Sequence, residues 1–275
     1  VALGLAGCTA PPERASVPPR EEVAAVVEPA VVVPDREPEE VSGPPRVMPA
    51  SSRRISAGAA HMCAVREDRS VVCWGNNMMG QLGDETDTHR PVPVAVRGVA
   101  DVVELAAGAW HTCARRGDGS VVCWGDAPGQ SRAHEVWTVP ALAGAAELAA
   151  GGAHVCGRVA AGVVCVAFAT RAEQAIAGLD DAVQLAVGQR HACALRRGGT
   201  VACWGENDEG QLGDGTTTDR ASAADVAGVV KAVQVAAGGA HTCALHSDGA
   251  VRCWGYNEGG VLGVKGGHPQ VTPAL

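Results

Sequence analysis

The chain has few aromatic residues, and this limits what can fill its core. Phe, Tyr and Trp make up 3% of the 275 residues, whereas apolar residues of all kinds reach 47%. Alanine and valine must therefore do most of the filling, and such small side chains suit sheets that pack closely face to face. The sequence also lacks an apolar run of the length that spans a bilayer.

Basic runs and catalytic motifs are missing as well. The net charge is −8, which disfavours nucleic-acid binding. No nucleophile elbow, phosphate-binding loop or zinc signature occurs, so we expect no catalysis, no cofactor and no metal. Asp84, Asp214 and Asp219 lie near glycine-rich loops and leave calcium binding as an alternative. Aspartates in turns, however, usually cap their own backbone.

Cysteine, in contrast, is abundant and regularly placed. The pattern Gly-x-x-His-x-Cys occurs five times, starting at Gly58, Gly108, Gly151, Gly188 and Gly238. A second cysteine follows the first after ten residues in four repeats and after nine in the third. Four of the second cysteines precede Trp-Gly. Repeats of this length, each with several short strands, indicate a propeller or a solenoid.

Each pair of cysteines is expected to join the two strands of a β-hairpin. Near the C-terminus, two short apolar runs flank Ser-Asp-Gly, which is a turn signal. Cysteines directly opposite each other in such a hairpin lie at a distance that a disulfide can span. The predicted pairs are Cys63–Cys73, Cys113–Cys123, Cys156–Cys165, Cys193–Cys203 and Cys243–Cys253. Metal binding by the histidine and both cysteines, or free core thiols, remain alternatives.

One repeat predicts four strands. The first covers 231–238, with Val233 and Val235 on one face, and the cysteine hairpin gives the next two. A loop of the form Trp-Gly-x-Asn-x-x-Gly-Gln-Leu-Gly follows, and a proline-containing segment such as 91–96 gives an edge strand. Cysteine and tryptophan point to opposite faces, so both faces should be buried.

A sheet with two buried faces favours a propeller over a two-layer sandwich. We predict an all-β fold for residues 53–275, a β-propeller of about five four-stranded blades. The third repeat should be the thinnest blade. We expect a monomer whose ring is closed or nearly so, with 269–275 as the last edge strand.

The N-terminus indicates export. Residues 1–8 end in Leu-Ala-Gly-Cys, which resembles the lipobox of bacterial lipoproteins, so Cys8 is the predicted lipidation site. Residues 9–52 are rich in proline and acidic residues and contain no aromatic residue. This composition predicts a disordered linker between membrane and propeller. We therefore expect localisation at the cell envelope through a lipid anchor, on the periplasmic or the outer surface.

The repeat unit resembles that of the regulator of chromosome condensation family. The resemblance rests on Gly-x-x-His-x-x-Ala-Leu, Asp-Gly-x-Val-x-x-Trp-Gly-x-Asn and Gly-Gln-Leu-Gly-Asp-Gly-Thr, and it covers residues 53–275. It implies a β-propeller, seven-bladed in the founding members, in which the histidine is structural. The third repeat departs from the pattern because it lacks Trp-Gly and Gly-Gln-Leu-Gly, and the second has only the decayed form 128–131. The paired cysteines are not a general feature of that family.

The residues that differ between repeats are the better guide to function, because one position repeated five times does not make a unique site. They are Met78, Met79, Trp110, Gln189, Arg190, Glu206 and Tyr256. Side chains of these types anchor interfaces, so we expect a non-catalytic propeller that binds a protein or glycan partner. The resemblance leaves a guanine-nucleotide exchange regulator as an alternative. A secreted inhibitor-like binder and an enzyme acting on glycans are two others.

Overall fold

The computed structural model describes residues 53–125, 135–264 and 269–274 of the chain. Cys8 and the predicted linker therefore lie outside the described residues, as does the decayed motif at 128–131. In the described part, none of the helices has the length and apolar character that crossing a membrane requires.

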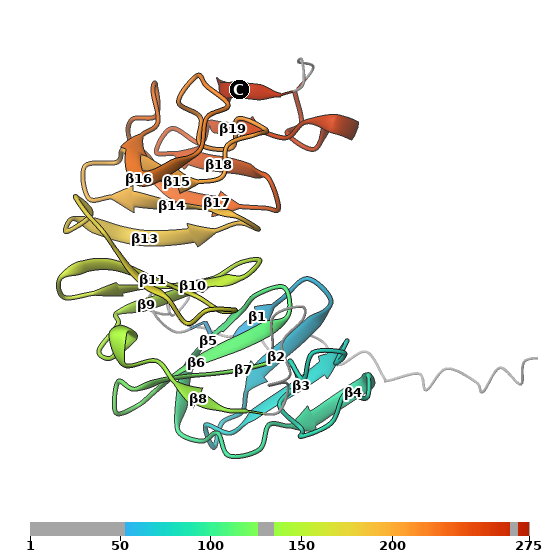
Figure 1. The fold of residues 1–275 in the computed structure, drawn as a ribbon. Coiled ribbons are helices and arrows are strands. Elements are labelled where there is room, and N and C mark those ends of the chain that lie inside the picture. Colours follow the sequence, from blue (N-terminus) through green and yellow to red (C-terminus); the bar gives the residue numbers. More distant parts are fainter. Residues whose placement is uncertain (1–52, 126–134, 265–268, 275) are drawn as a thin grey trace, which may run out of the picture. The chain divides into compact units, whose positions relative to one another are not determined.

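The described residues form five antiparallel sheets of four strands each (Figure 1). Each sheet is a blade, and its strands follow one another in chain order. Blade 1 contains β1 (Ile55–Ala57), β2 (His61–Val65), β3 (Val71–Gly75) and β4 (Arg90–Ala95). Blade 2 contains β5 (Val102–Ala107), β6 (His111–Arg116), β7 (Val121–Gly125) and β8 (Trp137–Thr138). This repetition confirms the predicted all-β fold.

The remaining blades repeat this order. Blade 3 contains β9 (Glu147–Ala150), β10 (His154–Val159), β11 (Gly162–Ala167) and β12 (Glu173–Ile176). Blade 4 contains β13 (Ala182–Val187), β14 (His191–Arg196), β15 (Val201–Gly205) and β16 (Arg220–Asp225). Blade 5 contains β17 (Ala232–Ala237), β18 (His241–His246), β19 (Val251–Gly255) and β20 (Gln270–Ala274). Two short 3₁₀ turns, η1 (Pro140–Leu142) and η2 (Glu258–Gly260), lie in connections.

The middle two strands of each blade are the cysteine hairpins. In blades 1, 2 and 5 the hairpin turn contains an aspartate that accepts a backbone hydrogen bond from two residues on, as Asp68 does from Ser70 at 2.9 Å. The two cysteines of each hairpin are directly opposite, with Cα atoms 4.1 Å apart in the Cys63–Cys73 pair. All five predicted pairs are disulfides in the structure.

The core lies between consecutive blades rather than within any one of them. Four clusters of buried apolar residues fill the junctions of blades 1 and 2, 2 and 3, 3 and 4, and 4 and 5. Trp254 and Cys253 of β19 are both buried and alternate in direction, so a blade contributes tryptophan to one junction and sulfur to the next. The prediction that both faces carry core residues is confirmed for the inner blades.

A carboxylate or amide on the first strand of one blade clamps the first strand of the next. Glu104 of β5 accepts the backbone N–H of Leu148 in β9 at 3.2 Å. Glu147 of β9 accepts the N–H of Leu185 in β13 at 3.2 Å. Gln184 of β13 accepts from the N–H of Val235 in β17 at 2.9 Å and donates to the carbonyl of the same residue at 3.2 Å. We call these contacts the inner clamps.

The expected ring, closed or nearly so, does not close between blade 5 and blade 1 in the described residues. No buried cluster joins blade 5 to blade 1 in these residues, and the strands that pack most extensively belong to the same blade or to consecutive blades. Blade 5 accordingly leaves valines in water: Val230, Val233, Val251 and Val261 are 57, 54, 50 and 49% exposed. On blade 1, Ile55 is 59% exposed. The expectation that every blade buries both faces therefore fails at blade 5.

The expected first strand of blade 5 was also wrong in one detail. The pairing of β17 with β18 shifts between Ala232 and Gln234, and this bulge turns Val233 outward while Val235 is buried. The expected last edge strand is confirmed, because β20 pairs with β19 alone. The proline-containing edge strand of blade 1 is confirmed as β4.

Candidate functional site

The seven residues singled out from the sequence lie at one end of their blades. Each blade has two connections there, one from its first strand to its second and one from its third to its fourth. They lie together because the second strand begins where the third ends, as His61 opposite Gly75 shows. Trp110, Gln189 and Arg190 occupy first connections, and Met78, Met79, Glu206 and Tyr256 occupy second connections. We call this end of the blades the loop end.

A depression of about 450 Å³ opens among the first connections of all five blades. Its wall consists of the Gly-x-x-His turns, and it includes Trp110 and Gln189. Successive turns are joined through their backbones: Ala59 donates to the carbonyl of Gly108 at 3.3 Å, and Ala109 donates to that of Gly151 at 2.9 Å. The structure thus brings two of the predicted residues to one concave surface, whereas Met78 and Tyr256 lie on other loops.

The first residue of each Gly-x-x-His turn must be glycine where the histidine ring and the backbone of the next blade lie too close for a side chain. A methyl group on Gly58 would collide with the ring of His61 and with the carbonyl of Gly108 in the next blade. The same overlap with the histidine ring is found at Gly108, Gly188 and Gly238. The Gly-x-x-His pattern is therefore a structural unit that sets the spacing of the blades.

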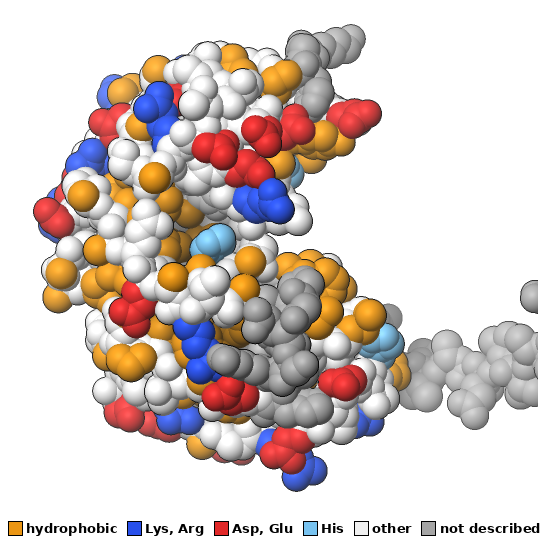
Figure 2. Space-filling model, in the orientation of Figure 1, with side chains coloured by type: hydrophobic (Ala, Val, Ile, Leu, Met, Phe, Trp, Pro, Cys, Tyr) orange, Lys and Arg blue, Asp and Glu red, His pale blue; other side chains and the backbone are white. Residues whose placement is uncertain are grey.

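Charges at the loop end are mixed. Figure 2 shows acidic side chains gathered at the upper right of the visible face beside a basic group, and scattered charges of both signs elsewhere. Arg190 is exposed and donates to the carboxylate of Glu206 at 2.7 Å. The hydroxyl of Tyr256 donates to Glu258 at 2.7 Å. These pairs hold two of the predicted binding residues, Arg190 and Tyr256, in place at the surface.

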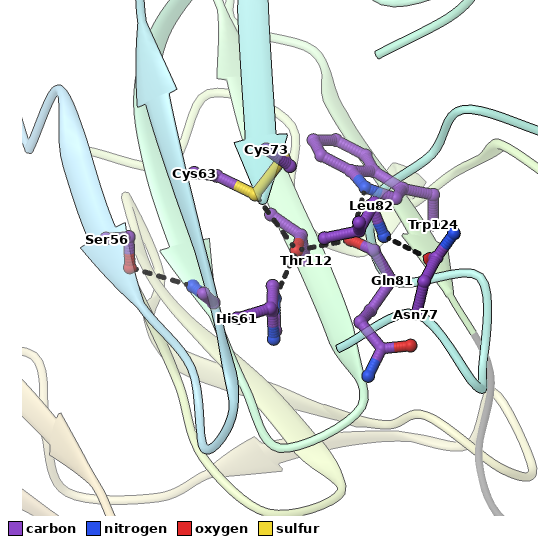
Figure 3. Close-up of a disulfide and its surroundings, with 10 residues drawn as sticks. Ser56, His61, Cys63, Cys73, Asn77, Gln81, Leu82, Thr112 and Trp124 are labelled. Atoms are coloured by element: carbon purple, nitrogen blue, oxygen red, sulfur yellow. Dashed lines mark hydrogen bonds between the residues drawn. A yellow bond between two sulfur atoms is a disulfide. The ribbon is translucent and has the colours of Figure 1, made fainter. Parts of the chain in front are cut away.

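The loop end also carries an interlock between blades, shown for blades 1 and 2 in Figure 3. The backbone carbonyl of Gln81, in the Gly-Gln-Leu-Gly segment of blade 1, accepts hydrogen bonds from blade 2. The donors are the indole of Trp124 at 3.0 Å and the hydroxyl of Thr112 at 3.2 Å. Thr112 also bonds His61 Nε2 at 2.9 Å, and Leu82 is fully buried beside them. We call this arrangement the latch.

Blades 4 and 5 have the same latch. The carbonyl of Gln211 accepts from Trp254 at 2.8 Å and from Thr242 at 3.1 Å. Thr242 bonds His191 Nε2 at 2.8 Å. Leu212 is buried next to this network. The recurring segments of the repeat are thus explained as contacts between neighbouring blades.

The latch histidines are neutral in the folded chain. Burial lowers the pKa of His61 and His191 to about 4, and that of His111 to about 3. A histidine charged only at such acidity cannot act as a general acid at neutral pH. His111 lacks a threonine partner among the described residues and stacks on Phe168 of blade 3, with ring centroids 4.1 Å apart.

The aspartates considered for calcium are engaged within their own loops. Asp84 accepts hydrogen bonds from Asn77, Thr86 and Arg90 at 2.9, 2.8 and 2.8 Å. Asp214 bonds the Thr216 hydroxyl at 2.7 Å and pairs with Arg220. No group of three or more potential metal ligands occurs in the part of the chain that the structure describes. These carboxylates stabilise the loops that carry the latch.

The junction of blades 3 and 4 has no latch. Blade 3 passes from β11 to β12 without a Gly-Gln-Leu-Gly segment, and a cavity of about 110 Å³ stands in its place. Its lining includes the Cys156–Cys165 disulfide, Ala192, Trp204 and Gly205, and also His154 and Arg190. We call this cavity the seat, because its walls correspond to those that hold Gln81 and Gln211.

Sequence reasoning missed the latch and the seat, although a signal was present. Threonine follows the repeat histidine only at Thr112 and Thr242, and both belong to the blade after an intact Gly-Gln-Leu-Gly. The blade after the defective third repeat has Ala192 at this position. This correlation between neighbouring repeats predicts a contact from one blade to the next.

Five four-stranded blades joined through repeated loop contacts define a repeat β-propeller. Comparison with models of protein families finds the Regulator of chromosome condensation (RCC1) repeat in two forms. One form matches residues 53–81, 182–211 and 232–260. The other matches residues 70–115 and 198–245. The matches together cover more than half of the chain, which therefore belongs to this family.

Solved structures show the same fold. Human WBSCR16 is 21% identical, with a TM-score of 0.67 over 80% of this chain and 65% of that one. Prp20p from Saccharomyces cerevisiae is 19% identical, with a TM-score of 0.54 over 80% and 75%. The ectodomain of the Physcomitrella patens receptor kinase CR4 is 21% identical, with a TM-score of 0.54 over 79% and 56%. The chain thus spans 65% of the length of human WBSCR16. The search of curated proteins finds no match.

Proposed function

We propose that this protein is a non-catalytic propeller at the bacterial cell envelope that binds a protein or glycan partner through its loop end. The observation that carries the proposal is the placement of the seven residues that differ between repeats. They come from four blades, and every one lies on a loop-end connection.

Binding is favoured over catalysis by the state of the titratable groups. Three of the repeated histidines are neutral and have a partner in the next blade: His61 and His191 bond a threonine, and His111 stacks on Phe168. Asp84 and Asp214 are held by their own loops. Catalysis needs groups that can exchange protons with a substrate, and these three histidines and two aspartates already have structural partners.

The envelope location is supported by the cysteines. Five disulfides in one chain are typical of an oxidising compartment. The lipobox-like sequence ending in Cys8 fits export with a lipid anchor. Metabolic labelling with a palmitate analogue, on the gene with its natural leader, tests the anchor. Cys8→Ser should abolish labelling, and equal labelling of the variant would contradict lipidation.

The alternative function is regulation of a GTPase. It is motivated by yeast Prp20p, whose structure was reported together with binding to Gsp1p and histones. Nucleotide release from small GTPases in the presence of the full chain tests it. An accelerated release would favour this alternative over a surface binder. An inhibitor-like binder would use the same loop end and would differ only in its partner.

Partner capture from the envelope tests the main proposal. A photo-crosslinking residue replaces Gln189, which is exposed at the loop end, or Asp118, which is exposed on a hairpin turn. We expect one partner to be captured from position 189 and not from 118, and Arg190→Glu should weaken the capture. Equal capture from both positions would contradict binding through the loop end.

A further inference from the structure

The seat can be compared with the same position at the two latched junctions, where a Gly-Gln-Leu-Gly segment of the preceding blade fills it. At these junctions the glycine after the latch tryptophan touches the preceding blade. A methyl group on Gly125 or Gly255 would lie 3.1 Å from the Cα atom of Gln81 or Gln211. For Gly205 the nearest atoms all belong to blade 4 itself. The backbone approach is therefore missing at the junction where the loop segment is missing.

The seat also keeps the hydrogen-bond donor of a latch. Trp124 and Trp254 donate their indole N–H groups to the carbonyls of Gln81 and Gln211. Trp204 holds the same position in β15, opposite Ala192 as Trp254 is opposite Thr242, and is 6% exposed. Its indole has no acceptor among the described residues. The indole nitrogen is not fully buried, so it faces the open cavity, and a ligand that supplies a carbonyl oxygen would replace water there.

The size and lining of the seat fit one aliphatic side chain. Its volume of about 110 Å³ is below the roughly 150 Å³ of a cavity that admits benzene. The wall consists mainly of sulfur and apolar groups: the Cys156–Cys165 disulfide, Val187, Ala192 and the Trp204 ring. At the latched junctions, the side chains buried beside the same features are Leu82 and Leu212.

We propose that the seat binds a tight turn of a partner protein that carries a leucine side chain and offers a backbone carbonyl to Trp204. The turn takes the place that Gly-Gln-Leu-Gly occupies at the two latched junctions. An anionic small ligand fits less well, because the arginines at the rim already have carboxylate partners. Arg190 pairs with Glu206, and Arg220 pairs with Asp214.

This inference rests on the proposed function in one respect, since both place a partner at the loop end. Arg190 lines the seat and is also one of the residues expected to bind the partner. The tests remain separable. Loop-end capture that persists while the seat takes no turn contradicts the inference alone, and loss of capture with an occupied seat contradicts the wider function.

The probe is a cyclic peptide with the chain's own sequence from 207 to 214, Asn-Asp-Glu-Gly-Gln-Leu-Gly-Asp. Cyclisation holds the turn and reduces the entropy lost on binding. The full chain carries ¹⁵N-labelled tryptophan, and Trp204→Phe assigns the Trp204 indole signal. We expect the peptide to shift this signal in a saturable manner. The Trp124 and Trp254 signals should stay in place, because their N–H groups are already bonded.

Three matched controls sharpen the result. A peptide with aspartate in place of its leucine should not shift the Trp204 signal. Ala192→Thr restores the hydroxyl that Thr112 and Thr242 supply, so it should tighten binding about threefold to tenfold, the size of one net hydrogen bond. Ala221→Trp, at the exposed rim of the seat, should abolish the shift.

An unchanged Trp204 signal at millimolar peptide would overturn the proposal, as would equal shifts with both peptides. Light scattering of the full chain covers a second occupant. A dimer that dissociates in Ala221→Trp would show that the seat holds a loop of another copy of this chain, and the partner-protein proposal would then be wrong.

Discussion

The junction of blades 4 and 5 and the junction of blades 3 and 4 are built from the same repeat but are held together differently. The former has the latch, in which Gln211 accepts hydrogen bonds from Trp254 and Thr242. The latter has the seat, where Trp204 faces a cavity. The inner clamp is present in both, through Gln184 in one and Glu147 in the other.

This difference shows that one repeat has two separate roles: its first strand joins neighbouring blades, and its loop end makes further contacts that can be lost. The inner clamps occur at the junctions of blades 2 and 3, 3 and 4, and 4 and 5. The first strands of the blades therefore hold consecutive blades together. The latch is found at two junctions of the described residues and is absent where blade 3 has only a short connection between β11 and β12. The latch at the loop end can therefore be lost while the blades stay joined. Its loss leaves the seat, a cavity in which a ligand can bind.

The largest expected effect on stability comes from replacing the tryptophan at the latched junction, Trp254, and comparing the loss with that for Trp204 at the seat. Trp254 is completely buried and bonded, so Trp254→Ala should lower the free energy of unfolding by about 3–5 kcal/mol. Trp204→Ala should cost clearly less, because the ring already borders a cavity. Guanidinium unfolding of both variants measures the difference. Equal losses would show that the latch adds nothing to the burial of the ring.

Acid should lower the free energy of unfolding because the buried histidines of the latch, such as His191, resist protonation in the folded chain. His191 has a folded pKa of about 4, below its ordinary value of 6.5. Between these values the unfolded chain takes up a proton that the folded chain refuses. Stability is therefore complete above pH 6.5 and falls as the pH drops toward 4, by about 1.4 kcal/mol per pH unit for each such histidine.

The variant His191→Gln isolates this contribution. Glutamine can still bond Thr242 but does not titrate, so the slope of stability against pH should decrease by about one proton between pH 6.5 and 4. Chemical unfolding at several pH values measures the slope. A slope identical to that of the unmodified chain would mean that His191 accepts a proton in the folded state.

Much of the fold could be predicted from the sequence, because the same pattern of glycine, histidine and cysteine recurs in five repeats. The hairpins, the disulfide pairs and the edge strand at 270–274 follow from local spacing and alternation. The outward turn of Val233 could not be predicted, since a bulge depends on how two strands pair and not on the pattern of one strand.

The site was predicted less completely, for a physical reason. Residues such as Trp110 and Gln189 stand out because they differ within one repeat position. The seat is made by the absence of a segment in blade 3, and its walls belong largely to blade 4. Closure of the ring depends in the same way on contacts between distant repeats. A single repeat contains no information about the face that its neighbour presents.

A smaller effect is expected from removing the hydroxyl that is shared within the latch. Thr242 bonds both His191 and the carbonyl of Gln211, and it is fully buried. Valine has the same shape without the hydroxyl, so Thr242→Val should lower the free energy of unfolding by about 1–3 kcal/mol. The loss arises because two buried polar groups lose their partner. Thermal and guanidinium unfolding measure it.

The matched change at the unlatched junction should have the opposite sign or no effect. Ala192 occupies the position of Thr242 and borders the seat together with His154. Ala192→Thr offers His154 the partner that His191 already has, without displacing any segment of blade 3. We therefore expect Ala192→Thr to leave stability unchanged or raise it slightly. If it instead destabilised the chain as much as Thr242→Val, the threonine would matter through local strand packing, and the distinction between latch and seat would not account for the stability of either junction.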